Sequence, residues 1–184
     1  NHPGKRLVLV LNKIDLVPIE VVNRWKEVLS REYPTVIFKA NLQQQNSNLA
    51  GQSIHKKLLE NEQELVDEIT KGSKSVGVDK LVELLKNYSR VDGGAVNKIT
   101  VGVFGFPNVG KSSVINSLTR RKAASVSSQP GHTKTIQEIE IDSKVTLIDS
   151  PGVVISNEDE VTLLLRNTIK AEDVVDLSKA VEEI

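Results

Sequence analysis

A glycine-rich stretch, Gly105–Ser112, constrains the fold of this chain more than any other feature of its sequence. It reads Gly-Phe-Pro-Asn-Val-Gly-Lys-Ser and fits the phosphate-loop pattern G-x-x-x-x-G-K-[S/T]. An apolar run over residues 99–104 predicts a strand before it, and Val114, Ile115 and Leu118 predict the buried face of a helix after it. This strand–loop–helix context favours a phosphate-binding loop over the alternative, a glycine turn that begins an ordinary helix.

The residues of this loop have separate expected tasks. The glycines let the backbone wrap around an anion, so that amides at the start of the helix point at phosphate oxygens. We expect Lys111 to bridge the terminal phosphates and the Ser112 hydroxyl to bind magnesium, which prefers oxygen ligands. The residues expected to line the phosphates are Asn108, Val109, Gly110, Lys111, Ser112 and Ser113.

The composition suits one globular domain. Of the 184 residues, 39% are hydrophobic and 26% are charged. Basic and acidic residues balance at 24 each, so the net charge gives no reason to expect tight non-specific binding to nucleic acid. The absence of cysteine excludes disulfides and thiolate metal sites. No apolar run reaches membrane-spanning length, and we expect a monomer with no membrane partner.

A second polar motif, Asn12-Lys13-Ile14-Asp15, follows a predicted buried parallel strand over residues 5–11. This tetrapeptide is typical of GTP-binding proteins, in which the carboxylate accepts hydrogen bonds from the ring N–H and the exocyclic amine of guanine. Adenine presents the opposite pattern and would leave the carboxylate unpaired, at a cost of roughly 1–3 kcal/mol or more. The alternative is that Asp15 caps the helix that follows Pro18. The residues expected to read guanine here are Asn12, Lys13 and Asp15.

A helix and a second strand are predicted to complete the guanine-reading half, residues 1–41. The helix spans residues 19–32 and ends before Pro34, with Trp25 in the core. Its predicted buried face consists of Val21, Val22, Trp25, Val28 and Leu29. A strand over residues 35–38 then leads to Ala40, whose backbone amide is the candidate to meet the guanine carbonyl.

The middle of the chain is predicted to hold an insertion and a connecting helix. The composition turns polar over residues 42–76, which indicates a peripheral helix between flexible ends. A more regular helix then begins with Asp79 as its N-cap and runs through Tyr88, within a connecting segment of residues 77–95.

A basic loop and a hairpin follow the phosphate-loop helix within the phosphate-loop and switch half, residues 96–184. The composition of residues 120–132 is typical of a mobile loop, and it leads to Thr133. We expect this threonine to reach magnesium when a γ-phosphate is present, the alternative being an ordinary surface threonine. The basic side chains that could meet RNA phosphate, although short basic runs are more often solvated surface, are Arg120, Arg121, Lys122 and Lys134.

The predicted hairpin has strands over residues 136–141 and 144–148. Its second strand delivers the tetrapeptide Asp149-Ser150-Pro151-Gly152. A carboxylate in this place usually holds magnesium through water, and the glycine amide can bind the γ-phosphate. We therefore expect Asp149 to be a magnesium residue and Gly152 to contact the nucleotide.

The four loops are predicted to form one nucleotide site, because each follows a strand and open α/β sheets bind ligands at the carboxyl ends of parallel strands. The predicted fold class is α/β, a three-layer phosphate-loop NTPase (Ras-like) fold with a mostly parallel sheet. In most GTPases the phosphate loop comes first, whereas here the guanine-reading motif precedes it. The motif order is therefore circularly permuted.

These motifs together resemble the circularly permuted GTPases of ribosome assembly, and in particular their nucleostemin-like branch. The resemblance to the wider family rests on the order of four motifs: Asn12–Pro18, Gly105–Ser113, Pro130–Lys134 and Asp149–Val153. Phe38-Lys39-Ala40 and Leu84–Arg90 are similar to the sequence of the nucleostemin-like branch. The resemblance covers nearly the whole chain except about residues 43–76. It implies binding and hydrolysis of GTP, with Mg²⁺ and a potential K⁺ as cofactors, and action on precursors of the large ribosomal subunit. It also implies a nucleolar or nuclear location, or the cytoplasm for a bacterial relative.

The resemblance also implies segments that these 184 residues do not contain. In the usual fold, one further strand lies between the phosphate-loop strand and residues 7–11. A central gap there would leave backbone groups of two strands unpaired, so we expect the chain to be a fragment of a longer protein. We expect the same of the C-terminal region with which such GTPases contact RNA or protein.

The sequence predicts slow intrinsic hydrolysis. Val153 and Val154 follow Gly152 where signalling GTPases have the glutamine that orients water, and no side-chain base is evident. Asn108 occupies the position at which related GTPases coordinate potassium, the alternative being an asparagine that bonds its own loop. Water would attack the γ-phosphate while Lys111 and the cations balance charge. Catalytic roles are predicted for Lys111, Thr133 and Asn108, and magnesium binding for Ser112, Thr133 and Asp149.

Two other functions stay open at this point. The domain could be a scaffold whose GTP occupancy sets its location or partners, with hydrolysis incidental. It could also be a phosphate-loop ATPase, which the guanine-reading motif disfavours.

Overall fold

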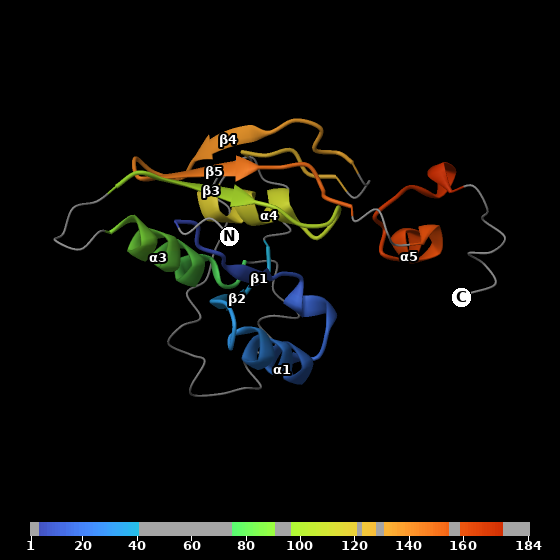
Figure 1. Cartoon of the computed structure of the whole chain (residues 1–184), viewed down its shortest axis with the longest axis horizontal. Helices are drawn as coiled ribbons and strands as arrows, with labels where there is room; N and C mark the ends of the chain where they lie inside the picture. The colour runs from blue at the N-terminus through green and yellow to red at the C-terminus, as the bar shows by residue number, and fades with distance from the viewer. Residues whose placement is uncertain are drawn as a thin grey trace.

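The fold is α/β, as the motifs predict, and contains parallel strands (Figure 1). The computed structural model describes residues 4–40, 75–90, 97–120, 123–127, 131–154 and 159–174. The elements in chain order are β1 (Leu9–Leu11), η1 (Ile14–Leu16), α1 (Ile19–Leu29), β2 (Thr35–Ile37), α3 (Val78–Ser89), β3 (Ile99–Val103), α4 (Lys111–Thr119), β4 (Gln137–Glu140), β5 (Val145–Asp149), α5 (Glu160–Leu165) and η2 (Ala171–Asp173). Among the described residues, no helix combines the length and apolar character needed to cross a bilayer.

The described strands form two sheets. In one sheet β1 pairs in parallel with β2, with Leu9 opposite Thr35. In the other, β3 pairs in parallel with β5 and β4 pairs antiparallel with β5, so the predicted hairpin is confirmed. Within the described ranges no strand pairing joins β1 to β3.

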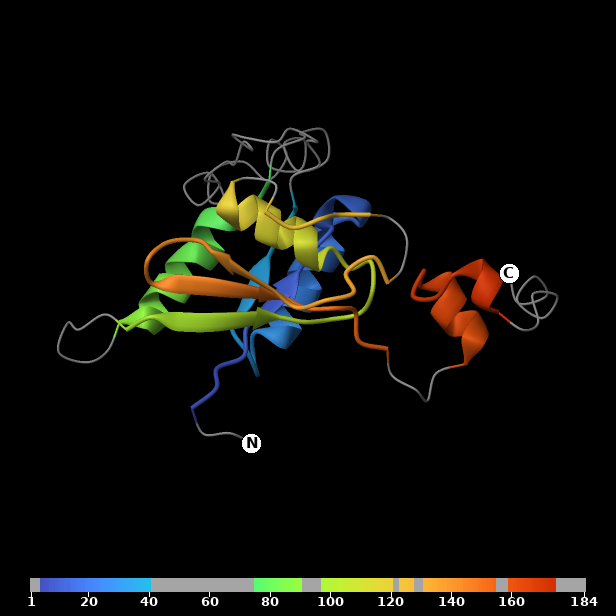
Figure 2. The same ribbon diagram turned by 90° about the horizontal axis from the view of Figure 1, so that it is seen from above.

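One hydrophobic core joins the two sheets, although no pairing between their strands occurs among the described residues. Phe38, Ile115 and Leu147 come from the end of β2, from α4 and from β5, and each is completely buried. Burial of one such side chain stabilises a fold by roughly 1.5–3 kcal/mol. Helices α3 and α4 pack beside each other on this core (Figure 2). The predicted buried face of α4 is confirmed, because Val114, Ile115 and Leu118 are all buried.

Helix α1 covers the other side of β1 and β2, but through only part of the face that the sequence predicts. Val22 is buried with Ile14, Ile37 and Val76, whereas Trp25 is 59% exposed. The predicted core position of Trp25 is therefore wrong. The helix carries two overlapping apolar faces, and only the one that contains Val22 meets the sheet. It also ends at Leu29 rather than at residue 32. Val21 and Val28 share the exposure of Trp25.

Helix α3 begins at a glycine, not at the predicted aspartate cap. Its N-cap is Gly77, which has φ 83°, a left-handed conformation that favours glycine. A Cβ there would meet the Ile37 carbonyl oxygen. Asp79 instead lies in the first turn of the helix, and Arg120 donates to its carboxylate at 3.4 Å. The predicted insertion lies outside the described residues except for its last two positions.

Candidate nucleotide-binding site

The phosphate loop follows β3 and ends at the first turn of α4. Gly110 is the N-cap of α4, and its φ of 96° favours glycine. Lys111 Nζ donates to the carbonyl oxygens of Gly105 at 3.1 Å and Phe106 at 2.8 Å. Burial lowers the pKa of Lys111, and the charge of Asp149 opposes this shift. The loop thus holds a partly desolvated lysine over its own backbone, where phosphate oxygens can replace the two carbonyls.

Three predicted magnesium residues lie together beside this lysine. Ser112 Oγ donates to Asp149 Oδ2 at 2.7 Å and lies 3.3 Å from Thr133 Oγ1. Asp149 is 1% exposed, and its second oxygen, Oδ1, is buried with no hydrogen-bond partner among the described residues. A buried carboxylate oxygen is costly unless a donor or a cation satisfies it.

This oxygen set fits a magnesium ion. It offers two hydroxyls and one carboxylate, all hard oxygen ligands, and magnesium usually takes its remaining ligands from water and phosphate. The described residues contain no group of three histidine, cysteine or acidic side chains that could hold a metal without such help. These residues therefore fit a metal ion that is bound partly by the protein and partly by the phosphates of a nucleotide.

Asn12 ties the guanine-reading loop to the phosphate loop. Its Nδ2 donates to the Val109 carbonyl oxygen at 2.8 Å, across 97 positions of sequence. Its Oδ1 accepts from the backbone amide of Ala40 at 3.3 Å. One side chain thus connects the ends of β1 and β2 to the loop after β3, and the amide predicted to meet guanine is bonded to Asn12 here.

Asp15 is free to accept from a ligand. It lies in η1, half-buried, and its carboxylate has no hydrogen-bond or ion-pair partner in the part of the chain that the structure describes. Pro18 is the N-cap of α1, with no side-chain cap hydrogen bond, so the capping alternative does not occur. Lys13 is exposed and has φ 60°.

The loop after β5 packs directly on the phosphate loop. The amide of Val153 donates to the Gly105 carbonyl oxygen at 3.0 Å, and Ser150 Oγ donates to the Val103 carbonyl oxygen at 2.6 Å. A Cβ on Gly152 would lie 2.6 Å from Pro107 Cγ and 2.8 Å from its backbone nitrogen. Only glycine therefore allows this approach, a contact that the motif spacing does not reveal.

Comparisons with known proteins show which family the chain belongs to. Residues 100–182 match a family model described as 50S ribosome-binding GTPase. The chain is 48% identical over 176 residues to "Guanine nucleotide-binding protein-like 3 homolog" of Caenorhabditis elegans, a match of 94% of this chain and 30% of that protein. The chain belongs to the nucleostemin-like family of GTP-binding proteins. This confirms the family that the motifs indicate.

More distant relatives match over a similar range. "Nuclear GTP-binding protein NUG1" of Saccharomyces cerevisiae is 37% identical over 191 residues, which is 97% of this chain and 33% of that protein. "Nucleolar GTP-binding protein 2" of Schizosaccharomyces pombe is 33% identical over 172 residues, 92% of this chain and 26% of that protein. The nucleostemin-like chain thus spans about a third or less of the length of these relatives.

In this nucleostemin-like domain, Asn108 bonds a distant segment. It has φ 58°, and its Nδ2 donates at 2.8 Å to the carbonyl oxygen of Asn167, which follows α5. The contact links the phosphate loop to the segment after the Asp-Ser-Pro-Gly loop, so the asparagine does not simply bond its own loop. Potassium binding by its amide oxygen stays a prediction.

Asn116 is a positioning residue that the sequence reasoning missed. It is 7% exposed on α4, and its Oδ1 accepts from the amides of Ala123 at 2.9 Å and Ala124 at 2.7 Å. Its Nδ2 donates to the Ala124 carbonyl oxygen at 2.8 Å. It therefore fixes the start of the loop that leads to Thr133. A polar residue inside the apolar run of α4 was the available signal.

Proposed function

We propose that this domain binds GTP with magnesium and hydrolyses it slowly, in a Ras-like fold whose motif order is circularly permuted. The observation that carries the proposal is the Asn12 side chain, which bonds both Val109 of the phosphate loop and Ala40. This contact supports one site that contains both Asp15, whose carboxylate would read guanine, and Lys111, which would bind phosphate.

Each phosphate-side residue has a distinct task in the proposed reaction. Lys111 would exchange its two carbonyl partners for phosphate oxygens. Because the lysine is partly buried, its positive charge would attract phosphate more strongly than it would in water. Ser112, Asp149 and Thr133 would hold magnesium, which neutralises charge that develops on the γ-phosphate. Asn116 bonds the backbone of Ala123 and Ala124, at the start of the loop that leads to Thr133.

Slow hydrolysis follows from the residues after Gly152. Val153 and Val154 are 54% and 40% exposed, and neither can orient or deprotonate water. We propose that a potassium ion at the Asn108 amide oxygen supplies positive charge beside the phosphates in the transition state. Turnover should then be faster in potassium than in sodium, measured as phosphate release at matched ionic strength. Equal rates in the two salts would contradict this role of Asn108.

We also propose that the protein acts in assembly of the large ribosomal subunit. The matched family model is described as ribosome-binding, and relatives carry the words nuclear and nucleolar in their names. A nucleolar or nuclear location and contacts with precursor ribosomal RNA and proteins follow from that likeness as proposals.

The choice of GTP is tested by replacing Asp15 with alanine. The wild-type domain should prefer GTP to ATP. The variant should lose most of that preference, because it has no carboxylate to accept hydrogen bonds from the guanine N–H groups. Competition of GTP and ATP against a fluorescent guanine nucleotide measures both. An unchanged preference in Asp15→Ala would remove the guanine argument.

A second function, a scaffold gated by nucleotide, is favoured by the same two valines. In that case GTP occupancy sets partner binding and hydrolysis is incidental. Multiple-turnover hydrolysis with and without precursor large-subunit particles separates the two functions. Strong stimulation supports the assembly enzyme, and no stimulation at saturating particle concentration supports the scaffold.

A further inference from the structure

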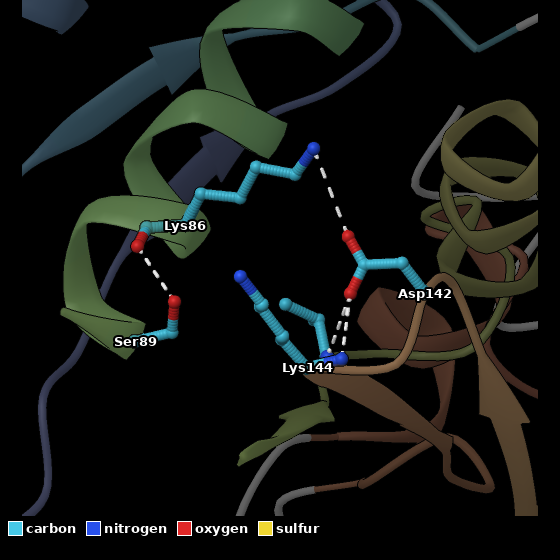
Figure 3. A network of polar contacts seen from close by, with 5 residues as sticks. Lys86, Ser89, Asp142 and Lys144 are labelled. Atoms are coloured by element: carbon cyan, nitrogen blue, oxygen red, sulfur yellow. Dashed lines mark hydrogen bonds and ion pairs between the residues drawn. The ribbon is translucent and has the colours of Figure 1, made fainter. Parts of the chain in front are cut away.

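A pocket lies at the end of the β3–β5–β4 sheet that is opposite the candidate nucleotide site. It has a volume of about 320 Å³ and is formed by the last turn of α3 and the turn between β4 and β5. Figure 3 shows side chains from these two elements facing each other across it. Its lining residues are Lys86, Ser89, Arg90, Asp142, Ser143 and Lys144.

Positive charge dominates this pocket. Three of its lining residues are basic and one, Asp142, is acidic. Asp142 Oδ2 lies 3.7 Å from Lys86 Nζ, so it offsets that lysine. Arg90 and Lys144 are exposed, and within the described residues neither side chain has an acidic partner. Two cations are thus left for a ligand.

Asp142 is fixed as an anion by the turn itself. Its Oδ1 accepts from the backbone amides of Lys144 at 2.8 Å and Val145 at 3.0 Å. The Lys144 amide is the largest cause that lowers the pKa of Asp142, and Lys86 lowers it further. The turn therefore orients the Asp142 carboxylate beside Lys86, at the end of α3.

We propose that this pocket binds a backbone phosphate of RNA. A guanidinium fork and a lysine ammonium match a phosphate group, and the exposed hydroxyl of Ser143 can donate a further hydrogen bond. The Ser89 hydroxyl already donates to the Lys86 carbonyl oxygen at 2.7 Å, so it is not counted as a donor. The choice of RNA over other polyanions rests on the ribosome-binding part of the proposed function.

The pocket is built to hold backbone and not to read bases. None of its lining residues is aromatic, and the nearby ring of Tyr88 is covered by the Arg6 guanidinium at 4.8 Å. Stacking platforms for bases are therefore lacking among these lining residues. Binding should depend on salt and little on sequence.

The pocket and the proposed GTP site lie at opposite ends of β5, so RNA binding can be changed by mutation without touching the GTP site. Lys144 precedes β5 and Asp149 ends it, so the two lie roughly 16 Å apart at the usual strand rise. A phosphate group bound beside Lys144 is therefore too far away to contact Asp149. The negative end of the α3 dipole opposes an anion in the pocket, and the basic residues of its last turn offset it.

The test measures binding of a fluorescent single-stranded oligouridylate to this chain by anisotropy over a range of salt concentrations. Arg90→Gln with Lys144→Gln should weaken binding, and the slope of log affinity against log salt should fall by about 1.4, which is two contacts at roughly 0.7 each. Asp142→Asn keeps an acceptor for the turn and removes a negative charge, so it should strengthen binding. The matched control is Arg24→Gln with Lys80→Gln, which removes the same charge from exposed positions outside the pocket.

Three results would overturn the proposal. Equal losses in the pocket and control variants would show that only net charge matters. A poly-glutamate chain that binds as well as RNA, and weakens with the same variants, would make the pocket a site for an acidic protein segment. No RNA binding by the wild-type chain, with binding of a fluorescent GTP analogue intact, would remove the RNA pocket and leave the nucleotide site standing. Thermal unfolding of each variant checks that it folds.

Discussion

At the scale of single residues, Asn12 is the side chain on which the nucleotide site depends most. It forms hydrogen bonds with Val109 and Ala40. These bonds connect three loops that follow three different strands. The side chain of Asp15 can read guanine only when its loop is held at the right distance from the phosphate loop. In the proposed site, the Asn12 bonds to Val109 and Ala40 would hold the loops together and lower the conformational cost of binding.

Replacing Asn12 with alanine should weaken GTP binding about tenfold, because two hydrogen bonds of roughly 0.5–1.5 kcal/mol each are lost. Calorimetric titration of GTP with magnesium measures the change. Asn23→Ala, an exposed asparagine on α1, is the matched control and should bind GTP as the wild type does. Equal affinities in the Asn12 variant and this control would show that the loops are positioned by other contacts.

The sequence predicts which residues form the proposed site, but it could not predict the contacts among them. Lys111, Ser112 and Asp149 stand in motifs whose spacing is fixed by phosphate and magnesium chemistry. The bond from Asn12 to Val109 spans 97 positions, and no local pattern encodes it. Asn116 was missed for a related reason, since its partners lie in a loop with no regular structure.

At the scale of elements, the contact between the two phosphate-side loops is the tightest part of the site. Gly152 lies against the ring and backbone of Pro107, and Val153 donates to the Gly105 carbonyl oxygen. A shift of one loop must therefore move the other. We therefore expect a γ-phosphate bound at the phosphate loop to change the position of Gly152 and Val153.

Replacing Gly152 with alanine should separate these two loops, because its Cβ would lie 2.6 to 2.9 Å from atoms of Pro107. We expect loss of most GTP hydrolysis with a smaller loss of GDP affinity, since GDP lacks the γ-phosphate at this contact. Gly102→Ala on β3 is the matched control, since its Cβ would meet nothing within 4 Å. Phosphate release and GDP titration measure the two effects, and a Gly152 variant with unchanged hydrolysis would contradict this coupling.

Helices and strands were predicted where one periodic pattern dominates, and mispredicted where two patterns overlap. The buried face of α4 has one apolar stripe and is confirmed. Helix α1 has two, and the stripe that contains Trp25 is the exposed one. Asp79 is a good cap by residue type, but Gly77 can adopt the left-handed turn that β2 and α3 require there. Tertiary packing decided both cases.

At the scale of the whole molecule, the nucleotide site joins two sheets that share a core but no described strand pairing. The guanine-reading loop follows β1, and the phosphate loop follows β3. The sequence predicts that these loops lie at one edge of a single sheet, whereas the described strands form two sheets. It could not predict that Phe38, Ile115 and Leu147 would pack the sheets together, since those contacts depend on the fold as a whole.

A ligand that touches both loops should therefore stabilise the whole domain. At a free GTP concentration of 100 times its dissociation constant the gain is about 2.7 kcal/mol, which raises the melting temperature of a chain of this size by roughly 5–11 °C. Differential scanning calorimetry with magnesium measures it. Inorganic triphosphate fills the phosphate loop alone, so it should give a smaller rise at the same concentration, and Asp15→Ala should reduce the GTP rise toward the triphosphate value. Equal rises with GTP and triphosphate in the wild type would show that the guanine-reading loop adds nothing to the cohesion of the two sheets.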